Sequence, residues 1–341
     1  MTDASRSGHR SFLVTSLGAY ADSGLGTGGF TCVREGEAVV IDKIDSTALH
    51  ESGGAIYRFA RGLQSIVGYG EDGLRSILRI PEARDVHDVL LRDGHFVCVS
   101  TGTNEVVWVD PLGRIARRWT ADGVGDAWHL NCLYEADGRL FLSAFGRFSA
   151  HREWLNQCAG TGFVFDLESG REVLSGLSGP HNQRFIEGEW VVCNSHAKSL
   201  VIQRRDGRRE EVALNGFTRG LAYDGDFFYV GESANRKAEI PADHSFIAII
   251  DRRSLNVVDR IRIPFPEIYE IVLIAPEFAA RITGELSRFQ IDRGSDRIRE
   301  LENQVELSLK EIEALRVCVH DVSVYMEFKA HLTRIKRRLI G

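Results

Sequence analysis

Three histidines stand at the same place in a repeated sequence pattern, and together they could do chemistry. His87, His129 and His181 each open a short apolar stretch that a glycine-containing turn joins to a second one, and Arg219 stands near that place in a fourth copy. A strand, a glycine turn and a second strand, repeated along a chain, are typical of the blades of a β-propeller. Because the inner strands of the blades begin around one axis, the pattern predicts several imidazoles around a single opening.

The residues at or beside these predicted strand starts form a candidate catalytic site, with His87, His129, His181, Arg219 and Glu270 as its reactive members. Imidazole and carboxylate groups are common ligands of catalytic metals, so the three histidines could hold a divalent metal with the carboxylate as a fourth group. Alternatively, the same residues could act as acid, base or nucleophile while the arginine receives an anionic group. Either site would suit a transferase, a hydrolase or a lyase. In a third interpretation, each histidine only hydrogen-bonds to the backbone of the neighbouring blade.

A second set of polar residues is predicted to bind the substrate. Some of them lie next to the candidate catalytic residues, and others follow the second strand of a blade in polar, glycine-rich stretches. The set comprises Asp88, Asn131, Asn182, Tyr269, Arg147, His196 and Arg236. Such stretches can be simple tight turns, or they can form a polar rim that binds a hydroxyl-rich ligand.

The elements that would position these residues form six blades. Inner strands are expected to begin near residues 46, 87, 129, 181, 218 and 269. No second strand follows the last of them, whereas residues 8–16 read like the turn and second strand of the other copies. A ring of sheets leaves no open edge when one blade is built from both ends of the domain. The sequence therefore predicts an all-β six-bladed β-propeller over residues 8–276, closed by N- and C-terminal strands.

A different pattern predicts a C-terminal α-helical coiled coil over residues 285–341. Apolar residues recur there at alternating steps of three and four, among them Ile298, Leu301, Val305, Ile312 and Leu315. Such a seam predicts a homo-oligomer, most simply a parallel dimer, although a single amphipathic helix lying on the propeller is the alternative. The final residues are basic and amphipathic, which fits either peripheral contact with an anionic membrane surface or a solvated helix end.

Composition narrows the class of partner and the compartment. The net charge of −6 gives no general basic field, so nucleic acid is not expected as a partner. The six cysteines have no CxxC spacing, which favours buried free thiols in a reducing compartment. No apolar leader is apparent near Met1. These observations predict a cytoplasmic protein, with the basic C-terminus as its contact to the inner membrane surface.

Several short runs of the sequence resemble a known family. They are residues 85–90, 99–105, 126–131, 179–182 and 218–221. These runs are similar to the DUF4915 family of bacterial β-propeller proteins, and the resemblance covers about residues 10–275. It implies a propeller but no particular activity. It also implies a setting in surface-polysaccharide gene clusters, where a glycosyltransferase would be a partner.

Two hypotheses from different classes follow. In the first, the propeller has a polar, histidine-rich axial pocket that binds or acts on a carbohydrate-like or anionic small molecule, in bacterial surface-polysaccharide assembly. In the second, the protein is a non-catalytic oligomeric scaffold for a glycosyltransferase or another assembly partner. The orientation of the histidine side chains distinguishes the two hypotheses, since a pocket requires them to face the axis and a scaffold allows them to pack between blades.

Overall fold

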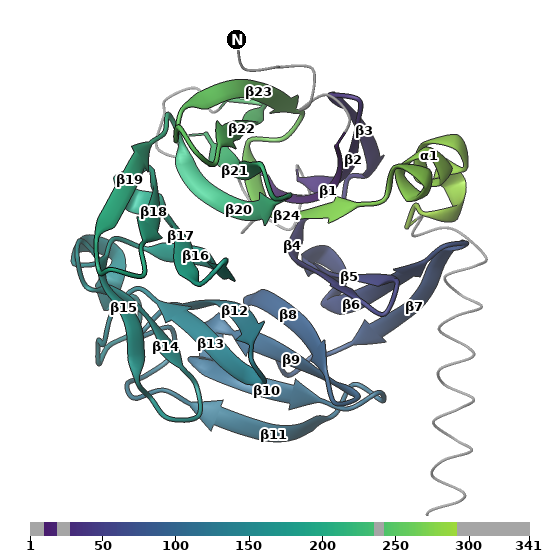
Figure 1. The fold of residues 1–341 in the computed structure, drawn as a ribbon. Helices are drawn as coiled ribbons and strands as arrows, with labels where there is room; N and C mark the ends of the chain where they lie inside the picture. Colours follow the sequence, from purple (N-terminus) through teal and green to yellow (C-terminus); the bar gives the residue numbers. More distant parts are fainter. Residues whose placement is uncertain (1–9, 19–27, 235–241, 292–341) are drawn as a thin grey trace, which may run out of the picture. The chain divides into compact units, whose positions relative to one another are not determined.

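The computed structural model describes residues 10–18, 28–234 and 242–291, whose strands form six four-stranded antiparallel sheets. The sheets stand in a ring around one axis, as blades do in a propeller (Figure 1). The prediction of a six-bladed all-β propeller is therefore confirmed. The predicted coiled coil lies almost wholly outside the described residues.

Each blade runs from an inner strand at the axis to an outer strand at the rim. From inner to outer, blade 1 contains β24 (Glu267–Ile274), β1 (Ser11–Leu17), β2 (Gly29–Arg34) and β3 (Glu37–Asp42), and blade 2 contains β4 (Ser46–Ser52), β5 (Ala55–Ala60), β6 (Ser65–Gly70) and β7 (Gly73–Arg79). Blade 3 contains β8 (Val86–Arg92), β9 (His95–Ser100), β10 (Glu105–Val109) and β11 (Ile115–Thr120), and blade 4 contains β12 (Leu130–Ala136), β13 (Arg139–Ala144), β14 (Gly162–Asp166) and β15 (Glu172–Leu177). Blade 5 contains β16 (Pro180–Ile186), β17 (Glu189–Asn194), β18 (Ser199–Gln203) and β19 (Arg209–Ala213), and blade 6 contains β20 (Phe217–Tyr223), β21 (Phe227–Ser233), β22 (Ser245–Asp251) and β23 (Val257–Ile263).

Blade 1 closes the ring in the way the sequence predicts. Strand β1 lies between β24 and β2, so the first described strand pairs with the last one. Phe12 stands opposite Leu273, and Val14 stands opposite Ile271. The side chains of Phe12 and Val14 are fully buried against blade 6, beside Tyr229. The closing strand is therefore part of the apolar core as well as of the sheet.

The apolar core lies between neighbouring blades. Val99 and Val106 of blade 3 pack with Leu142 and Phe163 of blade 4, and blades 5 and 6 meet through a similar cluster. Cys32, Cys98, Cys132, Cys158 and Cys193 are buried and unpaired, as predicted from their spacing. Because each sheet buries both of its faces, its strands read as nearly continuous apolar runs, and that is why the repeat is visible in the sequence.

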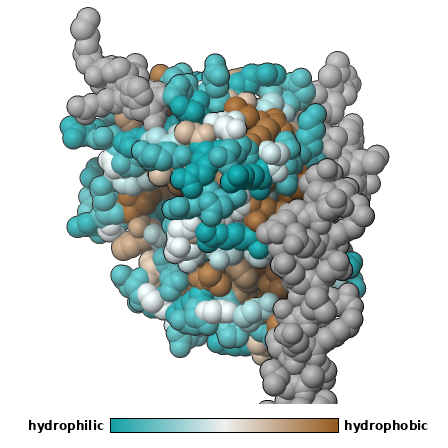
Figure 2. Space-filling model, turned by 90° about the vertical axis from the view of Figure 1, so that its right-hand side faces the viewer, coloured by the Kyte–Doolittle hydropathy of each residue, from teal (hydrophilic) through white to brown (hydrophobic). Residues whose placement is uncertain are grey.

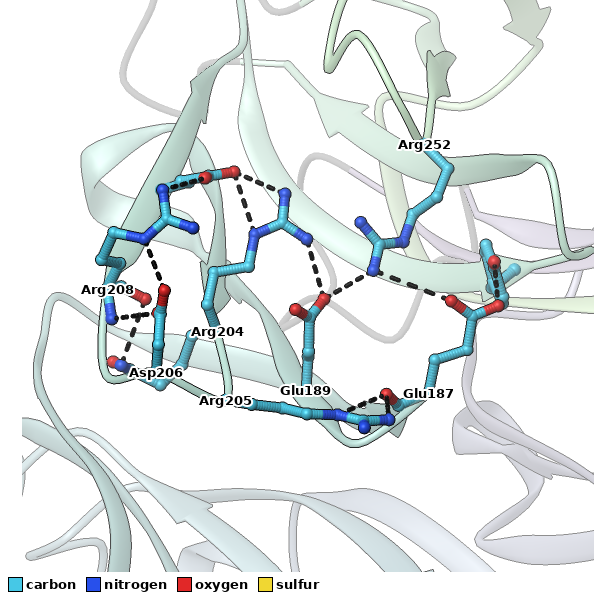
Figure 3. A network of polar contacts seen from close by, with 10 residues as sticks. Glu187, Glu189, Arg204, Arg205, Asp206, Arg208 and Arg252 are labelled. Atoms are coloured by element: carbon cyan, nitrogen blue, oxygen red, sulfur yellow. Dashed lines mark hydrogen bonds and ion pairs between the residues drawn. The ribbon is translucent and has the colours of Figure 1, made fainter.

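Ion pairs add to the contact between blades 5 and 6 on their partly exposed side (Figure 3). Glu189 of blade 5 accepts hydrogen bonds from Arg204 of the same blade and from Arg252 of blade 6. Arg204 also pairs with Glu210, and Arg208 pairs with Asp206. Such surface pairs contribute at most about 1 kcal/mol each. The network thus supports a contact that the apolar core already makes.

The compact unit continues beyond the last propeller strand to Gln290. Helix α1 (Pro276–Gly284) and the short η7 (Leu286–Arg288) follow β24, and α1 lies at the rim beside blades 1 and 2 (Figure 1). The ring of Phe289 stacks on Tyr69 of blade 2 with ring centres 6.5 Å apart, and it is 1% exposed. A truncation that preserves this packing must therefore retain residues up to 290.

The face of the unit that Figure 2 shows is mainly polar. On the side seen in Figure 2, hydrophilic residues cover most of the surface, and hydrophobic ones gather in a few places between them. Among the described residues, no helix combines the length and the apolar character that crossing a membrane would require.

Removing residues 1–18 should prevent the ring from closing. The deletion takes away β1, so β24 and β2 lose their common partner, and the buried side chains lost with it are worth roughly 1.5–3 kcal/mol each. We expect insoluble or molten protein, detected by loss of the near-ultraviolet circular dichroism signal and of cooperative urea unfolding. A chain lacking only residues 1–9 keeps β1 and should fold. A cooperatively folded chain that starts at residue 19 would contradict the proposed closure.

Candidate functional site

A β-bulge at the start of each inner strand positions the axial side chains. In blade 3, Val86 stands opposite Ser100 and Asp88 stands opposite Val99, so His87 is the extra residue. In blade 1, the same kind of shift makes Tyr269 the extra residue. The other four inner strands have a register shift near the same place. An extra residue bends the strand and redirects its side chain. In blades 3 and 1 that residue is itself axial, His87 or Tyr269, whereas in blades 5 and 6 the shift comes directly after His181 and Arg219.

Six side chains at or just before these register shifts form what we call the axial cluster: His87, His129, His181, Arg219, Glu267 and Tyr269. The ring centres of His87 and His129 are 5.0 Å apart, and those of His87 and Tyr269 are 5.6 Å apart. The guanidinium carbon of Arg219 lies 4.8 Å from the centre of the Tyr269 ring. The structure thus brings together the three predicted histidines, the predicted arginine and the predicted tyrosine.

His181 uses both of its ring nitrogens within the protein. Its Nε2 atom accepts a hydrogen bond from Nε of Arg219 at 3.1 Å. Its Nδ1 atom lies 3.0 Å from the carbonyl oxygen of Gly179 and 2.7 Å from the hydroxyl of Ser195. Arg219 in turn pairs with Glu267. His181 therefore has no free nitrogen for a metal, and the charge of Arg219 is already compensated.

His87 and His129 each use only Nδ1. In His87 this atom is 3.0 Å from the carbonyl oxygen of Asp85, and in His129 it is 2.9 Å from a carboxylate oxygen of Asp126. Within the described residues, the Nε2 atom of neither histidine has a hydrogen-bond partner. The ring of Trp154 covers His129, with ring centres 3.9 Å apart. These two imidazoles are the histidines of the axial cluster that keep a ring nitrogen for a ligand.

Burial keeps the histidines of the axial cluster uncharged. It lowers the pKa of His87 to about 3, and it lowers the pKa values of His129 and His181 well below the ordinary value. The physical cause is the cost of placing a charged imidazolium away from water. For the same reason, burial raises the pKa of Asp126 to about 7. Near neutral pH the three imidazoles can accept or donate hydrogen bonds, but they carry no charge.

The geometry does not support the predicted metal site. Among the described residues, no group of three or more His, Cys, Asp and Glu side chains is arranged to hold a metal ion. His181 is engaged by Arg219 and Ser195, as described above. The carboxylate of Glu270, the predicted fourth group, accepts hydrogen bonds from Asn182 at 2.7 Å and from Arg184 at 3.0 Å. Hydrogen bonds within the propeller therefore engage two of the four groups proposed for the metal, His181 and Glu270.

Other predicted residues lie further along the inner strands and join blades to one another. Asp88 accepts hydrogen bonds from the backbone N–H groups of Val89 and of Leu133 in blade 4, at 2.8 and 2.7 Å. The side-chain oxygen of Asn182 accepts a hydrogen bond from the backbone of Gly220 in blade 6 at 2.7 Å. Asn131 donates to the carbonyl oxygen of His129, while its own side-chain oxygen has no partner in the described part of the chain.

The predicted surface residues are placed differently from one another. Arg147 pairs with Glu172 on the outer strand of blade 4, and its guanidinium lies over Phe163, away from the axial cluster. His196 is exposed, and its ring lies 5.5 Å from that of Phe145, which also contacts His129 and His181. Arg236 lies outside the described residues. Of the three, His196 is the one that the structure places close to the axial cluster.

Sequence reasoning missed the acidic residues that precede the axial positions. Asp85 stands two residues before His87, Asp126 stands three residues before His129, and Glu267 stands two residues before Tyr269. The repeated acidic residue, two or three positions before an axial residue, could have identified these side chains as neighbours of the axial cluster. Trp154 and Arg184 had no comparable signal, since their contacts with His129 and Glu270 depend on the fold.

The sequence of the blades shows which family the chain belongs to. Residues 76–281 match the family model of DUF4915, described as a domain of unknown function. The chain belongs to the DUF4915 family. The match includes every member of the axial cluster and most of the propeller, so the structure shows how this family arranges its blades. A comparison with curated proteins found no match.

Solved structures similar to this DUF4915 propeller agree on the fold alone. A protein of unknown function from Bacteroides caccae is 14% identical, with a TM-score of 0.54, over 78% of this chain and 99% of that one. A chain of the nidogen/laminin complex is 9% identical, with a TM-score of 0.55, over 78% of this chain and 99% of that one. The calcium-binding protein regucalcin from Agrobacterium tumefaciens is 13% identical, with a TM-score of 0.50, over 68% of this chain and 79% of that one.

Replacing Asp126 by Asn should change how stability depends on pH. Because the folded protein binds the Asp126 proton more tightly than the unfolded chain does, this group's contribution to stability falls as the pH rises from about 4 to about 7. The Asn side chain can still accept the hydrogen bond from His129 but cannot ionise. The free energy of unfolding of Asp126→Asn, relative to the unmodified protein, should therefore rise over this range by on the order of 3 kcal/mol.

Urea unfolding at several pH values between about 4 and 8 measures this difference. The exposed Asp122→Asn variant removes a neighbouring carboxylate and should show no such rise. A pH dependence of Asp126→Asn that parallels that of the unmodified protein would contradict the assignment.

Proposed function

We propose that the axial cluster binds a small polar molecule, either carbohydrate-like or anionic. The observation that carries the proposal is the hydroxyl of Tyr269. Its side chain is 2% exposed, and the hydroxyl has no hydrogen-bond partner in the described chain. Leaving a buried hydroxyl unpaired costs about 1–3 kcal/mol, and a phenylalanine would avoid that cost. A ligand that bonds to this hydroxyl accounts for it.

The neighbours of the hydroxyl support the same proposal. The ring of His87 lies beside Tyr269, and the unpartnered Nε2 atoms of His87 and His129 belong to the same cluster. A phenol and two neutral imidazoles can bind a hydroxyl-bearing molecule. His87 and His129 are therefore the residues that would take part in any catalysis.

Access to the cluster is narrow. His87 is 7% exposed, His129 is 6% exposed and Arg219 is 5% exposed. The aromatic rings of Phe145, Trp154 and Phe217 lie around them. A ligand would therefore reach the axis with a small end, such as a terminal sugar residue, and aromatic rings suit the apolar faces of such a group.

Binding of sugars and sugar acids by Tyr269→Phe tests the proposal. We expect hexoses or uronic acids to stabilise the full chain in thermal-shift and calorimetric titrations, and we expect Tyr269→Phe to bind about tenfold more weakly without losing stability. Tyr223→Phe removes a hydroxyl that bonds to Glu187, on the same kind of strand but at its other end, and serves as the control. Tyr223→Phe should bind as the unmodified protein does. The proposal is wrong if Tyr269→Phe also binds every ligand as well as the unmodified protein does.

We also propose that residues 285–341 associate copies of the chain, as a setting for a glycosyltransferase partner in polysaccharide assembly. The regular seam at Ile298, Leu301, Val305, Ile312 and Leu315 supports this proposal. Light scattering should give an oligomer for the full chain and a monomer for a chain that ends at residue 290, which keeps Phe289 in place. Equal association states for the two chains would contradict an oligomerising tail.

A further inference from the structure

We infer that the ligand of the axial cluster is uncharged and rich in hydroxyl groups, as a neutral sugar is, rather than an acid or a phosphate. This inference rests on the proposed function and selects between the two ligand classes that it leaves open. Three features carry it: the pairing of the nearby cations, the hydrogen-bonding direction of the free atoms, and the burial of the cluster.

The arginines near the axial cluster each have an acidic partner, the longest contact being that of Arg152 with Asp126 at 3.9 Å. Arg219 pairs with Glu267 inside the cluster, and both side chains are almost fully buried. Arg61 pairs with Asp85 at 2.9 Å beside His87, and Arg184 pairs with Glu270 at 3.0 Å further along the axis. An anionic ligand would therefore meet compensated cations, together with the carboxylates that compensate them.

The free nitrogen of His87 is a hydrogen-bond acceptor. Its Nδ1 atom contacts a carbonyl oxygen, that of Asp85, which can only accept a hydrogen bond. In a neutral imidazole the proton is then on Nδ1, and the lone pair is on Nε2. The same holds for His129 when Asp126 is ionised. The side-chain oxygen of Asn131, which has no partner within the described residues, is also an acceptor.

These acceptors require a ligand that donates hydrogen bonds. A sugar hydroxyl donates one hydrogen bond and accepts others, so it can pair with Nε2 of His87 and with the hydroxyl of Tyr269 at the same time. The oxygens of a carboxylate or of a phosphate dianion only accept, and they would face the lone pair of His87. Burying such a charge without a free cation is costly, whereas burying a hydrogen-bonded hydroxyl is not.

Matched pairs of neutral and acidic sugars test the inference on the full chain. Glucose with glucuronate, and galactose with galacturonate, differ at one carbon only. Calorimetric titration should show that the neutral member of at least one pair binds about tenfold more tightly or better than its acid. Its affinity should not change between low salt and about 0.5 M NaCl, because no charge is paired on binding.

Glu267→Gln tests the role of charge directly. The variant leaves Arg219 without its acidic partner in the cluster, so we expect uronate binding to improve by about tenfold while binding of the neutral sugar stays within about threefold. Glu82→Gln, which removes one of the two acidic partners of the exposed Arg118 on the outer strand of blade 3, is the control and should change neither affinity. If the variant does not fold, the selectivity and salt dependence of the unmodified protein decide the question.

Each outcome has a distinct meaning. Tight, salt-sensitive binding of a uronate or of glucose 6-phosphate by the unmodified protein would overturn this inference and leave the proposed axial binding site intact. Failure of every sugar and every sugar acid to bind would overturn the proposed function, and the inference with it. Selective binding of a neutral sugar that Tyr269→Phe weakens would support both.

Discussion

Strand β1 pairs with β24, the first described strand with the last, and this pairing turns six consecutive sheets into a ring. Every inner strand then begins near one axis, so a bulge that would be a local irregularity in an open sheet becomes part of a shared cluster. His87 and Tyr269 come from blades 3 and 1, yet they face each other because of that closure. Without the closing pair, these side chains would belong to separate sheet edges, and the edges would be open to other chains.

Ring closure also determines how charge is accommodated along the axis. Side chains that converge from several blades cannot all remain charged in a space with little water, so each charge needs a partner or must be lost. Arg219 and Arg184 have acidic partners from another blade, while burial keeps His87 neutral. These ion pairs link neighbouring parts of the ring. Because they compensate the charges, the axial residues would recognise a ligand through hydrogen bonds.

The blades could be predicted from the sequence, and the chemistry of the axis could be predicted only in part. The inner strands begin at residues 46, 86, 130, 180, 217 and 267, each within about two residues of expectation, because alternation and glycine turns are local signals. The prediction that the histidines meet at the axis followed from their common position at the starts of the inner strands. The partner of a side chain does not follow from register: Glu270 binds Arg184 across blades, and Trp154 reaches His129 from an insertion. A metal site was predicted from residue types alone, and hydrogen bonds that residue types do not reveal engage two of its four proposed groups, His181 and Glu270.

The segment that matches the family is shorter than the segment that forms the ring, and residues outside the match are needed to hold the axial side chains in place. Residues 76–281 contain the whole axial cluster but not β1, β2 and β3 of blade 1 or β4, β5 and β6 of blade 2. A ring cannot close without those strands. Strand β1 pairs with β24, the strand that carries Tyr269 and Glu267, and its Phe12 and Val14 lie in the core against blade 6. The matched segment thus holds the side chains of the site, while residues outside it hold them in register. Any activity of the axis is therefore a property of the closed propeller rather than of the matched segment.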